Sequence, residues 1–94
     1  MSKELNVNIP EETQPTYANL VQISHKDDEF TLNFLHRIPN TNQANAKAIV
    51  SITPQHAKRL KRALEQNIQK YESKFGKIDL PEEEEKEHHD VEIA

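Results

Sequence analysis

Four cationic side chains lie close together in the second half of the chain: Lys58, Arg59, Lys61 and Arg62. We call them the basic cluster. Such a cluster binds anions, for example the phosphate backbone of a nucleic acid, an acidic protein partner or an acidic segment of the same chain. The alternative is a solvated helix face, because charge runs are common on exposed surfaces. No aromatic residue interrupts the run, so stacking on nucleic-acid bases is not supported.

Two asparagines also stand out, because Asn19 and Asn33 each lie within an alternating apolar segment and asparagine is depleted in strands. A buried amide must find hydrogen-bond partners or it destabilises the fold. We therefore expect Asn19 and Asn33 to bridge a strand edge or a subunit interface. Contact with a bound ligand is the alternative.

Catalytic chemistry finds little support in this composition. The single glycine, Gly76, excludes glycine-rich phosphate loops and nucleophile elbows, and the lack of cysteine excludes disulfides and thiolate sites. His88 and His89 would at best bind a transition metal weakly, and His25 and His56 suit turn and helix-cap positions. We predict a protein that is not an enzyme and that has no cofactor and no metal site.

The elements that position these residues follow from the hydrophobic periodicity. Apolar residues alternate with a period of two, as in half-buried strands, over four segments: residues 5–9, 17–24, 29–36 and 45–52. The links between the last three segments are short and polar, which favours antiparallel neighbours.

At Thr53 the period changes to that of a helix. Thr53 can cap the first turn, Pro54 suits the first helical position, and Gly76 suits the position after the last turn. The apolar residues between them recur at spacings of three and four: Ala57, Leu60, Leu64, Ile68, Tyr71 and Phe75. The sequence therefore predicts one long amphipathic helix.

The predicted fold class is α+β, with a small antiparallel sheet of about four strands packed by one long C-terminal amphipathic helix in two layers. Because the helix covers one face of the sheet, Leu20, Leu35 and Ile49 would stay wet on the other face of a monomer. We expect the chain to bury them by self-association, as a homodimer or a larger homo-oligomer.

Charge divides the chain into three parts. We expect a disordered N-terminus over residues 1–4, a single α+β domain over 5–78, and a disordered acidic tail over 79–94. Residues 53–78 carry a net charge of +5, whereas residues 79–94 carry −7. The tail could therefore shield the basic cluster, or simply keep the protein soluble. The sequence has no signal peptide and no membrane-spanning run, so we expect a cytoplasmic protein without a membrane partner.

Four blocks of sequence, taken together and in order, resemble a family of short prokaryotic proteins called domain of unknown function 3467. The blocks are Tyr17–His25, Glu29–Phe34, Thr53–Leu60 and Tyr71–Gly76. The resemblance covers about residues 5–78 and implies a compact prokaryotic domain, but no activity. The order of strands followed by a helix is also similar in layout to export chaperones of the SecB type, without shared motifs.

These observations favour a small, homo-oligomeric binding or adaptor module. We expect it to bind other copies of itself and a protein partner whose identity is unknown. The alternative is a sequence-independent nucleic-acid binder that is regulated by its acidic tail. A further alternative is a chaperone-like binder of unfolded segments, which would use the wet face of the sheet.

Overall fold

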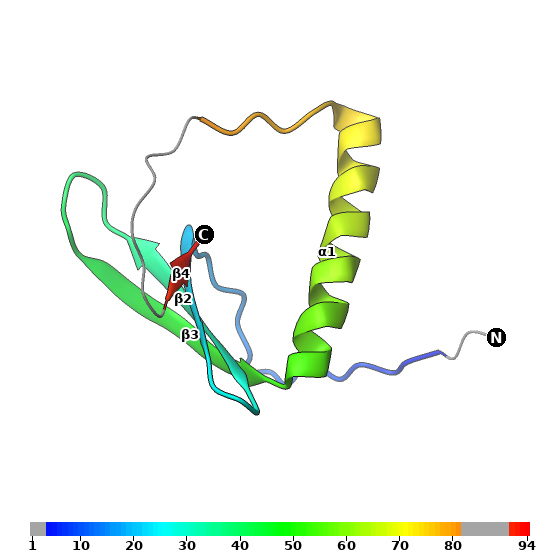
Figure 1. The fold of residues 1–94 in the computed structure, drawn as a ribbon, viewed down its shortest axis with the longest axis horizontal. Coiled ribbons are helices and arrows are strands. Elements are labelled where there is room, and N and C mark those ends of the chain that lie inside the picture. Colours follow the sequence, from blue (N-terminus) through cyan, green and yellow to red (C-terminus); the bar gives the residue numbers. More distant parts are fainter. Residues whose placement is uncertain (1–3, 82–90) are drawn as a thin grey trace.

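The computed structural model describes residues 4–81 and 91–94, which form a sheet and one helix. The α+β class, with a four-stranded antiparallel sheet and one long helix, is confirmed (Figure 1). The helix is not the last element, because a short strand follows it. The elements in chain order are β1 (Leu20–His25), β2 (Phe30–Arg37), β3 (Ala44–Ile52), α1 (Pro54–Phe75) and β4 (Glu92–Ile93).

The strands lie in the order β3-β2-β1-β4, and all neighbours are antiparallel. The first two links are a short turn over residues 26–29 and a longer loop over residues 38–43, each closed by a backbone hydrogen bond. Lys26 N–H donates to the Glu29 carbonyl at 2.8 Å, and Ile38 N–H donates to the Gln43 carbonyl at 3.0 Å. Asn40, in the longer loop, has φ 63°, a left-handed conformation that asparagine tolerates well.

The predicted strand at residues 5–9 is wrong. The segment has no strand partner, and Leu5, Val7 and Ile9 are 85%, 71% and 71% exposed. The fourth strand is instead Glu92–Ile93, which lies in the tail that we expected to be disordered over its whole length. Alternation signals a capacity to form a strand, but pairing requires a free sheet edge in the right place. Residues 1–3 and 82–90, which include most of the two predicted disordered ends, lie outside the described residues.

The register divides the sheet into two faces. Residues paired across strands share a face, and one face carries almost only apolar side chains, most of them half-buried. We call this the apolar sheet face, and its residues are Val21, Ile23, Phe30, Leu32, Phe34, Ala48, Val50 and Ile52. The opposite face mixes Leu20, Leu35 and Ile49 with polar residues such as Gln22 and Asn33.

An irregularity in the β2–β3 pairing shifts one predicted side chain to the other face. Phe34 is paired with Ala48, but Leu35 is paired with Ala46, so Lys47 is an extra residue in β3. Strict alternation predicts Ala46 and Ala48 on the same face. The bulge instead places Ala46 beside Leu35, on the opposite face.

The helix begins and ends at the predicted residues. The Thr53 hydroxyl oxygen accepts a hydrogen bond from His56 N–H at 3.1 Å, and Pro54 occupies the first turn. At the other end Gly76 has φ 101°, a conformation that favours glycine, and its N–H donates to the Glu72 carbonyl at 2.9 Å. Both termini are therefore defined by local capping.

The apolar residues of the helix are not covered within one chain. Only Thr53 separates β3 from α1, and Figure 1 shows the helix rising away from the sheet after this junction. No helical residue is buried, and Leu64 and Phe75 are 56% and 66% exposed. We call Leu60, Leu64, Ile68, Tyr71 and Phe75 the helix stripe.

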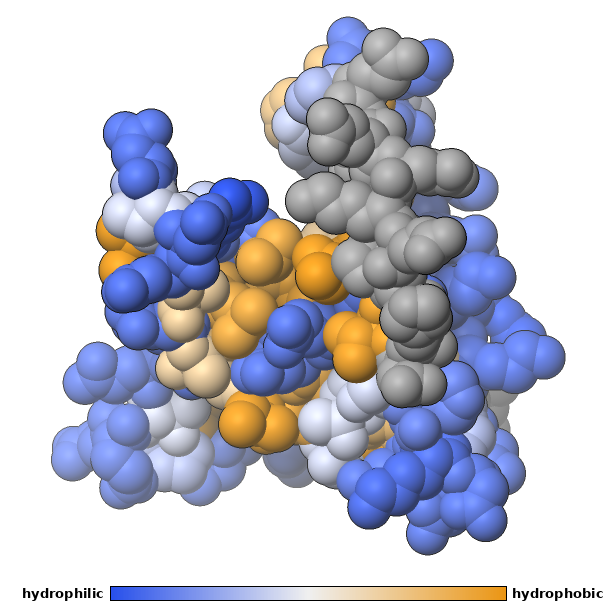
Figure 2. All heavy atoms as spheres, turned by 60° about the vertical axis from the view of Figure 1, so that its left-hand side comes forward, coloured by the Kyte–Doolittle hydropathy of each residue, from blue (hydrophilic) through white to orange (hydrophobic). Residues whose placement is uncertain are grey.

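The chain accordingly has almost no interior of its own. Among residues 4–81 and 91–94, Leu35 is the only buried one, at 8% exposure. Figure 2 shows apolar side chains gathered at the centre of the visible surface and surrounded by hydrophilic ones. A sheet and a helix with well-defined limits thus leave most of their large apolar side chains in contact with solvent.

The helix cap provides a direct test of this local architecture. We expect Thr53→Ala to lower the free energy of unfolding by about 1 kcal/mol, because it removes the acceptor for His56 N–H. Thr53→Ser keeps a hydroxyl oxygen and should leave most of that stability. Urea denaturation followed by circular dichroism measures both, and equal losses in the two variants would contradict the capping role.

Candidate binding surfaces

The basic cluster lies on the first two turns of α1, and all four of its side chains are exposed. At about 100° per residue, Lys58, Arg59 and Arg62 point away from the helix stripe, whereas Lys61 lies beside it. Cations and apolar side chains therefore occupy different sides of the same helix. A partner on the stripe would leave most of the basic cluster accessible.

An acidic turn lies at the same end of the molecule as the basic cluster. Asp27, Asp28 and Glu29 fall in or beside the turn between β1 and β2. The pairing of Phe30 with Ile52 places this turn next to the end of β3 and hence near the start of α1 (Figure 1). These carboxylates lower the positive potential at this end of the molecule.

Asn19 connects the start of β1 to the end of β2. Its Oδ1 accepts a hydrogen bond from Arg37 N–H at 2.9 Å, and its Nδ2 donates to the Arg37 carbonyl at 3.5 Å. The side chain thus continues the ladder by one step, in the way that a paired backbone would. Asn19 has a structural role at the strand edge.

Asn33 lies in the centre of the sheet, on the face opposite the apolar one. Its Nδ2 donates to Gln22 Oε1 at 3.4 Å, but its Oδ1 is buried without a hydrogen-bond partner. An unsatisfied buried acceptor costs about 1–3 kcal/mol. Asn33 is therefore a site where one buried acceptor is left without a hydrogen bond, while its amide nitrogen bonds within the sheet to Gln22.

The structure does not bring the predicted site residues together. The basic cluster lies on α1, whereas Asn19 precedes β1 and bonds to Arg37, and Asn33 lies in β2 beside Gln22. Within residues 4–81 and 91–94, no three histidine or acidic side chains converge on a point where a metal ion could bind. His88 and His89 lie outside the described residues.

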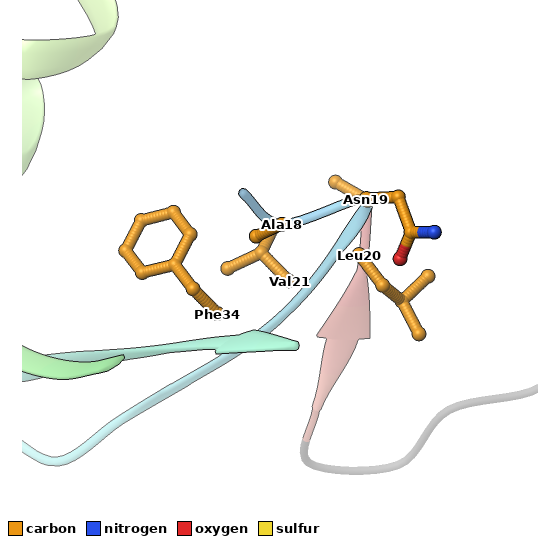
Figure 3. A pocket seen from close by; sticks show the side chains of 6 residues that line it. Ala18, Asn19, Leu20, Val21 and Phe34 are labelled. Carbon is orange, nitrogen blue, oxygen red and sulfur yellow. The ribbon is translucent and has the colours of Figure 1, made fainter. Parts of the chain in front are cut away.

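Two shallow hollows lie in the described surface. The larger, about 440 Å³, is lined by Arg37 at the end of β2 and by Asn40, Thr41 and Asn42 in the following loop. The other, about 260 Å³, lies at the start of β1 (Figure 3) and is lined by Ala18, Asn19, Leu20, Val21, Phe34 and Ala94. Of these only Asn19 was a predicted site residue. Ala94 lines the hollow because it pairs with Val21. No sequence motif near Ala94 predicts this pairing.

None of the helices in the described part of the chain is both long and apolar enough to cross a membrane.

Comparison with known proteins gives one match. The family model described as a protein of unknown function, DUF3467, matches residues 1–80. Neither the curated proteins nor the solved structures include a match to this chain.

The role of Asn19 is open to a simple measurement. We expect Asn19→Ala to lower the free energy of unfolding by about 0.5–1.5 kcal/mol, because Arg37 N–H loses its acceptor. Asn19→Asp keeps an acceptor oxygen and should retain most of the stability. Denaturant midpoints and the exchange rate of the Arg37 amide hydrogen decide the question, and an unchanged exchange rate in Asn19→Ala would rule out the bridge.

Proposed function

The chain belongs to the family of proteins of unknown function DUF3467, and because this membership assigns no activity, we propose that it is a non-enzymatic, homo-oligomeric binding or adaptor module. In this proposal the copies associate through the helix stripe and through the part of the apolar sheet face that lies away from the start of β1, namely Phe30, Leu32, Val50 and Ile52. The remaining surface, which includes the basic cluster, then stays free for a protein partner.

The exposure of the helix stripe is the observation that carries this proposal. Full burial of a large apolar side chain stabilises a protein by about 1.5–3 kcal/mol. The stripe has five such residues, all exposed in the single chain. The stripe residues are 38–66% exposed, so burying the part that is still in water contributes about 4–7 kcal/mol. This gain is comparable to the ~3–5 kcal/mol that the core of a domain of this size supplies, and it favours an arrangement that covers the stripe.

We infer that the molecule covering the stripe is a second copy of the chain. With only Leu35 buried among the described residues, a single chain has too small a core to fold first and wait for a different partner. A second copy is always present at equal concentration, and it offers a matching stripe and an apolar sheet face. A two-fold symmetric dimer buries these surfaces on both copies at once.

The geometry of α1 is compatible with such a dimer and with further binding. The stripe runs along one side of 22 helical residues, long enough to contact another helix or the sheet of a second copy. Lys58, Arg59 and Arg62 remain on the other side of the helix. They favour an acidic protein surface as a partner, by charge complementarity.

A charge placed in the stripe tests the proposed self-association. We expect Leu64→Asp to shift the protein from oligomer to monomer, or to unfold it, because a carboxylate cannot be buried there unpaired. Gln66→Asp introduces the same charge on the opposite side of the helix and should leave the oligomer intact. Sedimentation velocity at micromolar concentration, with circular dichroism on the same samples, measures both effects.

A stable, well-folded monomer of the unaltered protein would overturn the proposal. The apolar sheet face would then be free in solution, as the chaperone-like alternative requires. Equal effects of Leu64→Asp and Gln66→Asp on the oligomer would also contradict it, since only the first residue belongs to the stripe.

The nucleic-acid alternative is supported by one observation, the exposure of all four cations of the basic cluster. If it holds, the full-length protein should bind single-stranded or duplex DNA only weakly at low salt, because the acidic tail shields the cluster; removal of residues 81–94 should strengthen the binding, and added salt should weaken it steeply. Replacing Lys58, Arg59, Lys61 and Arg62 by glutamine should abolish the binding. Fluorescence polarisation with labelled DNA measures it, and no difference between the two proteins would exclude a role for the cluster.

A further inference from the structure

The outer edge of β1 carries a short strand from the far end of the sequence. β4 is antiparallel to β1, with Gln22 paired with Ile93 and Ile23 paired with Glu92. The pairing continues past β4, because Val21 N–H donates to the Ala94 carbonyl and Ala94 N–H donates to the Val21 carbonyl, both at 2.9 Å. Residues 92–94 thus cover half of the six residues of β1.

This strand lies outside the part of the chain that the family match covers. The match ends at residue 80, whereas β1, β2, β3 and α1 all lie within it. In the matched region alone, β1 would be an edge strand with a row of unpaired N–H and C=O groups. Such an edge pairs readily with an extended chain.

The strand in place fits this edge poorly. The register places Glu92 beside Ile23, on the apolar sheet face, where an apolar side chain would be more favourable. Ile93 is on the opposite face, beside Gln22, and is 44% exposed. Backbone hydrogen bonds therefore contribute most of the pairing, and the side chains add little.

The hollow at the start of β1 shows the same mismatch. Figure 3 shows the side chains of Ala18, Val21 and Phe34 on the same side of the sheet, around this hollow. Ala94 is paired with Val21, so its methyl group points to that side too. One methyl group leaves about 260 Å³ open to solvent. A larger apolar side chain in the place of Ala94 would reach Phe34 and Val21.

We propose that the outer edge of β1, together with this hollow, is a binding site for an extended peptide segment of a partner protein. The preferred segment carries apolar residues in the places of Glu92 and Ala94, and residues 91–94 occupy the site in cis as a weak substitute. The inference deepens the proposed adaptor function and rests on it for the use of the site. Binding occurs by addition of a strand, with affinity from the backbone and specificity from the two apolar positions.

The chemistry of the site favours a peptide over a nucleic acid. Its lining contains no cationic side chain, and its polar groups are a strand edge and the amide of Asn19. Asn19 is already engaged with Arg37, so it is not free to read a base or a sugar. A strand edge offers alternating donors and acceptors at the spacing of another strand.

Direct binding of a synthetic peptide tests the proposal. The probe is fluorescein-labelled Lys-Val-Val-Thr-Leu-Lys, which places valine and leucine where Glu92 and Ala94 lie. We expect Ala94→Pro to bind it about tenfold more tightly than the unaltered full chain, or ~1.4 kcal/mol, because the variant loses the Ala94 N–H and with it part of the cis pairing. Asp79→Pro is the matched control, since residue 79 lies outside the sheet, and it should bind like the unaltered chain.

A second variant acts in the opposite direction. Ala94→Leu fills the hollow in cis, so it should bind the probe more weakly than the unaltered chain and slow hydrogen exchange at the Val21 amide. A peptide with proline in place of leucine should not bind any of the proteins. The absence of saturable binding to Ala94→Pro, or equal affinities for Ala94→Pro and Ala94→Leu, would overturn the proposal.

Sedimentation of the same samples separates this inference from the proposed function. An intact oligomer that does not bind the probe overturns the peptide site and leaves the self-association standing. A monomeric protein that binds the probe, with the expected order of the two Ala94 variants, supports the peptide site and overturns the homo-oligomeric module.

Discussion

Removal of the apolar sheet face and the helix stripe from water is the requirement on which the rest of this structure depends. In a single chain the requirement is not met, because α1 diverges from the sheet after one connecting residue and none of its residues is buried. The secondary structure is nevertheless well defined, with caps at both ends of the helix and regular pairing of three long strands. The homo-oligomer proposed above would meet the requirement by forming a core between copies.

The sheet has two edges, and they differ in how they are covered. β3 is one edge, and it has no strand neighbour among the described residues beyond β2. The other edge, β1, pairs with residues 92–94, which bring a glutamate to the apolar face and an alanine to a half-empty hollow. Residues 92–94 supply backbone hydrogen bonds to half of this edge, whereas their side chains pack poorly against it. This imbalance is the basis of the peptide-binding site proposed for the edge of β1.

The sequence by itself determined the elements whose signals are local. Thr53, Pro54 and Gly76 set the limits of the helix, because caps and backbone preferences act within one turn. Alternation located the three strands from β1 to β3 to within a few residues, since each has one apolar face. The polar turns between them then required antiparallel neighbours. The α+β class follows from these features alone.

Only the tertiary structure decided the pairings between distant segments. Residues 5–9 alternate as well as any strand but have no partner, whereas residues 92–93 show no strand pattern and still pair with β1. The bulge at Lys47, the bridge from Asn19 to Arg37 and the hollow beside Ala94 depend on the same long-range register. The divergence of α1 from the sheet was also not visible in its periodicity. An amphipathic pattern states which side of a helix must be buried, but the surface that buries it is set by the positions of other elements in space.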